Sequence, residues 1–422
     1  MSTQGGVFES YLTENELAAQ LARISARQGL RHAYVGLQVA ARSRFAAVRE
    51  GALLALEEAE NHAVRADCLT KPLTATLLAR AAPAHFLSWS DEIGAVLELA
   101  SPWRTRLAGV SLANLLNHTH GLDAPTVAQI PRTPDGWIDV EALCGQLAAA
   151  PLNVPGRLYS YSNTGAWFIG AALERLFRRP YSLLLHEHRL WPVEAGGRAL
   201  APTSVCPASG TDLELSMAQW LAFLSLHLRD RSPAIASLQL SRVSLPGWSP
   251  SERATCLGWK HYGGSWFGHN SNAGGSSALL RFNVEEDVAV VVEAADDAAF
   301  IVLAGLFGRA LPEFADLRPP RILSTSERAA VELERYIGTY VQAQSRLEVA
   351  INTAARAEPC LTVEMRTADG ATEAQPLRAA AGDLFINDPK VNAQLPFIQF
   401  VVPGPTGPFG YVWNGKQLWR RE

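Results

Sequence analysis

The sequence lacks the features that direct a protein to a membrane, a nucleic acid or an export pathway. No window of the 422 residues approaches the roughly 18 consecutive apolar residues of a membrane-spanning helix. The first residues, Met-Ser-Thr-Gln-Gly-Gly, do not combine a basic segment with an apolar one, as a secretory signal does. The net charge is −4, so there is no basic excess for nucleic acid or anionic lipid. We therefore expect a cytoplasmic protein without nucleic-acid or membrane partners.

Cysteine is scarce and follows no metal-binding pattern. The five cysteines, at positions 68, 144, 206, 256 and 360, are odd in number and show no Cys-x-x-Cys spacing. Free thiols in a reducing compartment, with no metal and no cofactor, are the simplest interpretation. The remaining composition, 48% hydrophobic and 18% charged, is ordinary for a globular protein, and the length suffices for one large domain or two.

The most informative segment that is present is Cys68-Leu69-Thr70-Lys71. Its spacing is almost one helical turn, so the side chains of Cys68 and Lys71 can meet on one face of a helix. A nucleophile needs a base within hydrogen-bond reach, and the amine of Lys71 would meet that need. Taken alone the pattern is weak, because most cysteines are inert buried residues.

Three other segments supply the context that the tetrapeptide lacks. Tyr161-Ser162-Asn163 precedes a helical run, and His269-Asn270-Ser271 follows Gly268. Residues 115–122, between the first two motifs, read Leu-Leu-Asn-His-Thr-His-Gly-Leu, and we interpret their histidines as structural. In this order the motifs resemble the serine β-lactamase and penicillin-binding-protein superfamily, in particular the branch of class C β-lactamases, D-aminopeptidases and family VIII esterases. That branch carries Ser-x-x-Lys, Tyr-x-Asn and a His-x-Gly or Lys-Thr-Gly triplet, so Cys68 stands where the branch has a nucleophilic serine.

The resemblance implies a catalytic role for four residues. Cys68 would be the nucleophile, and Lys71 its base if burial lowers the affinity of its amine for a proton. Tyr161 would relay a proton to the leaving group or stabilise the nucleophile. His269, at the first position of the third motif, would hydrogen-bond towards Tyr161 and the substrate.

Three further residues would bind the substrate. Asn163 would hold Lys71 and a substrate carbonyl, and the N–H of Asn272 would form the oxyanion hole together with that of Cys68. Ser271 stands where the superfamily has glycine, and its side chain would narrow the approach of a substrate to the strand. For this reason we do not expect a true β-lactamase.

A thiol nucleophile would form a thioester intermediate, which reacts readily with amines and thiols. We therefore expect a hydrolase or acyltransferase that acts on a small ester, thioester or amide, including a thioester bound to a carrier. Two alternatives remain: a non-catalytic ligand-binding homologue, and a variant in which Cys68 was introduced in place of a serine. Nothing in the sequence indicates the oligomeric state.

The order of elements predicts an α+β fold. Strand candidates at 34–40 and 45–49, and at 278–284 and 288–293, flank a helix-rich middle. Helices are expected over residues 12–28 and 166–178. A further helix is expected to begin at Cys68, with Asp67 near its N-cap. We predict that residues 1–318 form an antiparallel sheet flanked by helices, with an inserted helical subdomain, as in β-lactamases and transpeptidases.

The composition changes after Arg318-Pro319-Pro320, which we interpret as a linker. Short strand candidates follow at 347–351, 360–365, 384–387, 397–402 and 411–413, and Asn414-Gly415 is typical of a hairpin turn. We expect residues 321–422 to form a small antiparallel barrel or sandwich, an accessory domain that either caps the first domain or gates its substrate.

Overall fold

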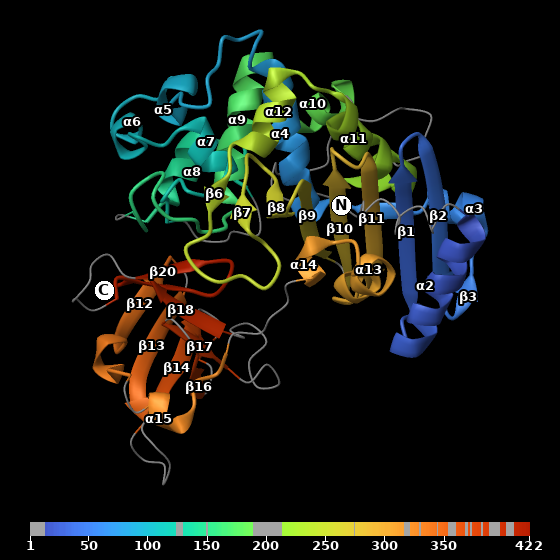
Figure 1. Ribbon diagram of the computed structural model, residues 1–422. Helices are drawn as coiled ribbons and strands as arrows, with labels where there is room; N and C mark the ends of the chain where they lie inside the picture. Colours follow the sequence, from blue (N-terminus) through green and yellow to red (C-terminus); the bar gives the residue numbers. More distant parts are fainter. Residues whose placement is uncertain are drawn as a thin grey trace.

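Two nine-stranded antiparallel sheets organise the protein. The computed structural model describes residues 13–123, 130–148, 151–188, 213–273, 275–315, 321–328, 331–343, 345–352, 360–367, 370–371, 374–380, 383–387, 397–401 and 409–422. One sheet lies within a helical body and the other forms a separate all-β body that carries the C-terminus (Figure 1). The α+β class and the all-β C-terminal part are therefore confirmed.

The first sheet joins strands from both ends of the helical body. Its order is β3-β2-β1-β11-β10-β9-β8-β7-β6, so the amino-terminal strand β1 pairs with β11. The strands are β1 His32–Val39, β2 Arg42–Arg49, β3 Ala52–Leu53, β6 Val243–Ser244, β7 Ala254–Thr255, β8 Lys260–Gly263, β9 Trp266–Ala273, β10 Ser276–Asn283 and β11 Val288–Ala295. The four strand candidates predicted from the sequence for this sheet correspond to β1, β2, β10 and β11. Their apolar residues pack on the two buried faces of the sheet.

Helices cover the two faces of the first sheet. Helices α2 (Glu14–Gln28) and α13 (Ala299–Phe307) pack on one face, and α11 (Met217–Arg229) packs on the other with α4 (Thr70–Ala81) and α9 (Thr164–Phe177) beyond it. The remaining helices are α3 Leu56–Glu60, α5 Ile93–Val96, α6 Trp103–Arg106, α7 Leu112–Leu116, α8 Val140–Gly145, α10 Tyr181–Glu187, α12 Pro233–Leu240, α14 Pro312–Ala315 and α15 Thr325–Arg328. None of the described helices combines the length and apolar character that crossing a bilayer requires.

The second sheet closes into a barrel, because β13 pairs with both β12 and β14. Its strands are β12 Gly338–Gln342, β13 Ser345–Asn352, β14 Cys360–Thr367, β15 Gly370–Ala371, β16 Gln375–Ala379, β17 Leu384–Ile386, β18 Phe397–Val401, β19 Tyr411–Trp413 and β20 Leu418–Arg421. The predicted linker at 318–320 lies outside the described residues, so the exact domain boundary stays a prediction.

The barrel packs against the helical body through the β19–β20 hairpin. The N–H of Tyr161 donates to the carbonyl of Lys416 at 2.8 Å, and the N–H of Leu418 donates to Ser160 Oγ at 3.1 Å. Trp413 and Leu418 share an apolar cluster with Tyr161 and with the partly buried Cys68. The barrel therefore meets the helical body at two of the predicted motifs.

Candidate catalytic centre

A short turn places Cys68 at the start of α4. Strand β4 (Ala63–Arg65) pairs with β5 (Glu214–Ser216), and the N–H of Ala66 donates to the carbonyl of Leu213 at 2.8 Å. The chain then reverses through Asp67, whose φ of +38° is unusual for a residue with a side chain. Cys68 follows in a 3-10 turn, Asp67–Leu69, which packs beside strand β9. The position of Cys68 is thus held by the β4–β5 pairing before it and by the contact of its turn with β9.

Asp67 lies near the N-terminus of α4, as expected, but it is not the N-cap residue. Helix α4 begins at Thr70, its N-cap position is Leu69, and no side chain caps it. The carboxylate of Asp67 instead faces the guanidinium of Arg65 at 3.5 Å. The positive φ at Asp67 turns the chain before the helix starts.

Cys68, Lys71 and Tyr161 come together as the motifs predict. The thiol of Cys68 is hydrogen-bonded to the hydroxyl of Tyr161 and to the ammonium of Lys71. The Nζ of Lys71, which is only 3% exposed, lies 4.8 Å from the centre of the Tyr161 ring. Cys68 itself is partly exposed, so a substrate can reach the sulfur.

This contact changes the proton affinity of all three groups. Burial alone would raise the pKa of the Cys68 thiol, but the Lys71 ammonium, the Tyr161 hydrogen bond and the Lys416 ammonium together lower it below its usual value. Burial lowers the pKa of Lys71 to about 8, although the Cys68 thiolate opposes that shift. Burial and the neighbouring thiolate raise the pKa of Tyr161 well above 10, so its phenol stays protonated and donates to sulfur.

His269 lies on β9 and completes the group that the sequence predicts to be catalytic. Its ring centre is 6.4 Å from that of Tyr161, and the imidazole is buried. Nδ1 lies 2.9 Å from the carbonyl of Asn270, so Nδ1 carries the proton and Nε2 is left as an acceptor. Burial and the Lys260 and Lys71 ammoniums hold the pKa of His269 well below 6.5, which keeps the ring neutral.

The three predicted substrate-binding residues do not share one surface: Ser271 and Asn272 point to opposite faces of β9, and Asn163 lies at the start of α9. Ser271 is buried and alternates onto the same face of β9 as His269. Asn272 alternates to the opposite face, where its Nδ2 donates to Asp297 at 2.5 Å. Its side chain is therefore directed away from His269, and the oxyanion role of its N–H stays a prediction.

Asn163 stands at the N-cap position of α9. Its Oδ1 is buried and has no hydrogen-bond partner among the described residues. The predicted hydrogen bond between Lys71 and Asn163 is therefore not formed, because an ammonium can only donate and this oxygen accepts nothing. A buried amide oxygen without a donor is costly, and a substrate N–H would satisfy it.

Three residues near the centre, Lys260, Lys416 and Glu252, were not singled out by the sequence, and a fourth, His118, was expected to be structural. Lys260 Nζ lies 5.8 Å and Lys416 Nζ 5.0 Å from the Tyr161 ring centre, and Lys260 is ion-paired with Glu252. The His118 ring stacks obliquely on Tyr161 at 4.6 Å, and its Nδ1 accepts the N–H of Ser162 at 3.3 Å. Lys260 was within reach of prediction, because it faces Gly268 in the β8–β9 hairpin. Lys416 had no local signal.

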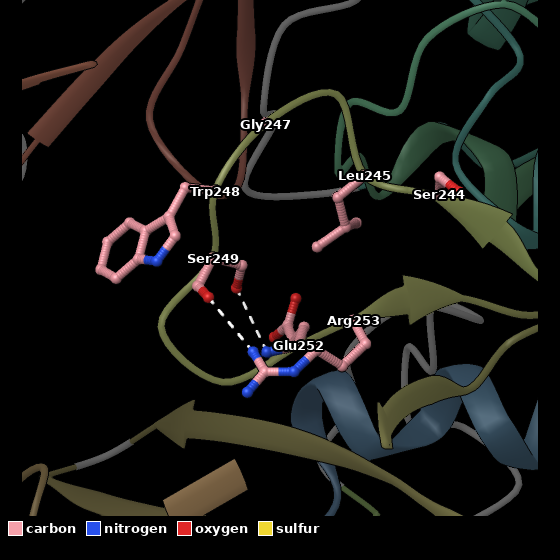
Figure 2. Close-up of a pocket in the computed structure, with 7 residues that line it drawn as sticks. All are labelled: Ser244, Leu245, Gly247, Trp248, Ser249, Glu252 and Arg253. Carbon is pink, nitrogen blue, oxygen red and sulfur yellow. Dashed lines mark hydrogen bonds between the residues drawn. The ribbon is translucent and has the colours of Figure 1, made fainter. Parts of the chain in front are cut away.

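A pocket opens beside this group, in the loop between β6 and β7. It has a volume of about 610 Å³ and is lined by Ser244, Leu245, Gly247, Trp248, Ser249, Glu252 and Arg253. Figure 2 shows these side chains, with the Arg253 guanidinium and the N–H of Glu252 both directed at Ser249. Glu252 of the pocket is ion-paired with Lys260, and Leu245 packs against the apolar cluster that includes Tyr161. The volume of the pocket is in the range of small-molecule sites.

The described residues offer no alternative centre based on a metal. No three His, Cys, Asp or Glu side chains in this part of the chain converge as metal ligands. The chemistry available is that of a thiol, an amine, a phenol and a neutral imidazole.

Known proteins share this architecture. Residues 22–196 match the family model described as Beta-lactamase. A probable fimbrial assembly protein, FimD of serogroup H1 from Dichelobacter nodosus, is 30% identical over 133 residues, which is 30% of this chain and 33% of that protein. The chain therefore spans about a third of the length of the curated relatives that it matches.

Two solved structures extend the likeness over more of the fold. SurE, crystallised with D-Leu, is 20% identical and covers 97% of this chain and 99% of its own, with a TM-score of 0.72. A D-amino acid amidase from Ochrobactrum anthropi SV3, complexed with D-phenylalanine, is 17% identical and covers 72% and 98%, with a TM-score of 0.54. The match to the Beta-lactamase family model is confined to residues 22–196, and the likeness to these two solved structures shows a shared fold.

Proposed function

We propose that the protein is a hydrolase or acyltransferase that forms a thioester acyl-enzyme on Cys68. The observation that carries this proposal is the contact of the Cys68 thiol with the Lys71 amine and the Tyr161 hydroxyl. A thiol with a lowered pKa, next to an amine whose pKa is about 8, is a nucleophile with its base.

The proposed reaction has two halves. Lys71 takes the proton of the Cys68 thiol, the sulfur attacks the acyl carbon, and the bond to the leaving group breaks as that group takes the proton back. The resulting thioester is then attacked by water or by an amine, alcohol or thiol acceptor, whose proton returns to the Cys68 sulfur through Lys71. Tyr161 donates a hydrogen bond to the sulfur in its charged state, and the neutral His269 can accept one from the substrate through Nε2.

We further propose that the acyl substrate contains a residue of D configuration. Two structural neighbours were crystallised with D-Leu and D-phenylalanine, and a third is named a D-stereospecific amidohydrolase. The pocket in the β6–β7 loop, whose Glu252 is ion-paired with Lys260, and the unpaired Oδ1 of Asn163 would supply the room and the acceptor that an acylated amino acid needs.

Intact-mass spectrometry tests the nucleophile directly. Purified protein is exposed to pairs of N-acyl thioesters and esters that differ only in D or L configuration. We expect a mass increase equal to the acyl group, located at Cys68 by peptide mapping, with faster formation from the D compound. The adduct must be absent from Cys68→Ala; an equal adduct in that variant, or none in the natural protein, would refute the acyl-enzyme.

A ligand-binding homologue without catalysis is the competing function. It predicts that Cys68→Ala binds the same compounds with unchanged affinity and that no adduct forms at all. The variant Cys68→Ser tests whether Cys68 has replaced an ancestral serine or whether the reaction requires a thiol. A gain of turnover on simple esters would favour an ancestral serine, whereas a loss of turnover would show that the reaction needs sulfur.

A further inference from the structure

Lysine is rare in this chain, and its few copies gather at one place. Only four of the 37 basic residues are lysines, at positions 71, 260, 390 and 416. Three of them, Lys71, Lys260 and Lys416, place their ammonium groups 4.8, 5.8 and 5.0 Å from the centre of the Tyr161 ring. Nearly all other positive charges of the protein belong to arginines. The gathering of three lysines around Tyr161 therefore suggests a specific role for their ammonium groups.

Two of the three ammonium groups have an evident counter-charge. Lys71 faces the Cys68 thiol, and Lys260 is ion-paired with Glu252, whose side chain is only 11% exposed. Among the described residues, no carboxylate forms an ion pair with Lys416. The salt bridges join other residues, such as Lys260 with Glu252 and Arg346 with Glu422. Lys416 therefore has no carboxylate bound to it directly in this part of the chain, and its main compensating charge is the Cys68 thiolate, which it shares with Lys71.

The fold holds Lys416 in this place through its backbone. It follows Gly415, which turns the β19–β20 hairpin with a φ of +91°, and its N–H donates to Asn414 Oδ1 at 3.1 Å. Its carbonyl accepts the N–H of Tyr161. Since none of these bonds uses the ammonium, the side chain is free to meet a ligand, and Lys416 is exposed to solvent.

We propose that the Lys416 ammonium, with Lys260 beside it, binds a carboxylate of the acyl substrate. The inference rests on the proposed function and names the substrate class: acyl donors that carry a negative charge close to the reacting carbonyl. Acylation turns the Cys68 thiolate into a neutral thioester, which leaves the positive charges around Tyr161 less compensated than before. A substrate carboxylate at Lys416 restores the balance of charge.

Two alkylating reagents of the same size test this proposal without any need for turnover. Iodoacetate carries a carboxylate and iodoacetamide a neutral amide, and both alkylate the Cys68 thiolate. The ratio of their rate constants cancels the fraction of thiolate, so it reports only the attraction of the site for the charged reagent. Peptide mapping separates Cys68 from Cys144 and Cys256, which are buried and have pKa values raised by burial to about 11 and about 12.

We expect the iodoacetate-to-iodoacetamide ratio at Cys68 to exceed that of free N-acetylcysteine by at least about threefold at low salt. Lys416→Gln should bring the ratio down to the free-thiol value, and Lys416→Arg should retain most of it. Arg420→Gln removes a positive charge from β20, the strand that follows Lys416, and serves as the matched control with an unchanged ratio.

Each outcome decides the matter. If Lys416→Gln slows both reagents equally, Lys416 acts only on the thiol pKa and the carboxylate site is refuted. A natural ratio no higher than that of N-acetylcysteine refutes it as well. Because alkylation needs no acyl transfer, loss of the acyl-enzyme adduct would overturn the proposed function while leaving this ratio intact.

Discussion

At the scale of single residues, the chemistry depends on how Lys71 and Cys68 share one proton. The ammonium favours the thiolate, and the thiolate favours the ammonium, so each group lowers the cost of charging the other. Burial opposes both charges. The pKa of the thiol is lowered because the Lys71 ammonium, the Tyr161 hydrogen bond and the Lys416 ammonium together outweigh the loss of hydration at sulfur.

Replacing Lys71 by methionine should leave Cys68 with the effect of burial and without its main compensating charge. The thiol pKa then rises, because the thiolate has lost the neighbouring positive charge that stabilised it. We expect the midpoint of the iodoacetamide rate against pH to move upward by about one unit or more, which means a roughly tenfold slower reaction at pH 7. Rates measured between pH 5.5 and 10 give the midpoint directly.

In the same experiment, Lys71→Arg separates the effect of the positive charge at position 71 from the role of Lys71 as a proton acceptor. Arginine keeps the positive charge but does not release a proton in this pH range. The midpoint should stay low while acyl turnover is lost. A midpoint that does not move in Lys71→Met would remove Lys71 from the role of partner to the thiol.

The sequence predicted the residues that belong to compact motifs, and the structure brings Cys68, Lys71, Tyr161 and His269 together. These motifs are visible because each places two functional atoms within a few residues of each other. Lys416 was out of reach, since its position depends on how a barrel some 250 residues later packs on Tyr161, at an N–H to carbonyl distance of 2.8 Å. The missing hydrogen bond between Asn163 and Lys71 was equally invisible, because it depends on how the starts of α4 and α9 are placed relative to each other.

At the scale of elements, the start of α4 is held in place by the turn after β7. Gly258 has a φ of +76°, and a Cβ added there would lie 2.4 Å from Ala75 Cβ and 3.3 Å from the carbonyl of Lys71. Its N–H also donates to the carbonyl of Leu116. The glycine therefore lets three elements meet directly behind the Lys71 side chain. The Leu257-Gly258-Trp259 segment is recognisable in the sequence, but the reason for its glycine is this contact.

Gly258→Ala should destabilise the fold by about 2–5 kcal/mol, the sum of a left-handed backbone strain and an overpacked contact with α4. Gly264→Ala is the matched control, since Gly264 also has a positive φ, of +54°, but open space at its Cβ position. We expect a loss of about 1–2 kcal/mol there. Urea unfolding of both variants measures the difference. Equal losses would show that the contact with Ala75 contributes nothing.

At the scale of the whole molecule, the barrel contacts the predicted catalytic residues directly. The interface includes Trp413 and Leu418 against Tyr161, and the N–H of Trp248 donating to Gln399 Oε1 at 2.6 Å. The sequence predicted the barrel from short strands and the Asn414-Gly415 turn, but its docking is a long-range event that strand patterns do not encode. Of the two expected roles, cap and gate, the position of Lys416 favours one that acts on the substrate.

A single glycine controls how closely the barrel approaches the pocket loop. A Cβ at Gly247 would lie 2.4 Å from Gln399 Oε1 and 2.9 Å from Trp413 Cε3. Gly247→Leu should therefore push the β6–β7 loop and the barrel apart, and carry Lys416 away from Cys68. Because the Lys416 ammonium lowers the pKa of the thiol, the midpoint of Cys68 alkylation should rise, by less than in Lys71→Met.

The tryptophan emission of the same variant reports whether the interface has opened, since Trp248 and Trp413 both lie at it. Gly145→Leu is the control, because Gly145 is exposed and has no neighbouring atom within 4 Å of its Cβ position. It should leave both the emission and the alkylation midpoint as they are. A shifted emission with an unchanged midpoint in Gly247→Leu would mean that barrel docking and thiol reactivity are independent. The barrel would then act on the reaction only through the substrate that it helps to bind.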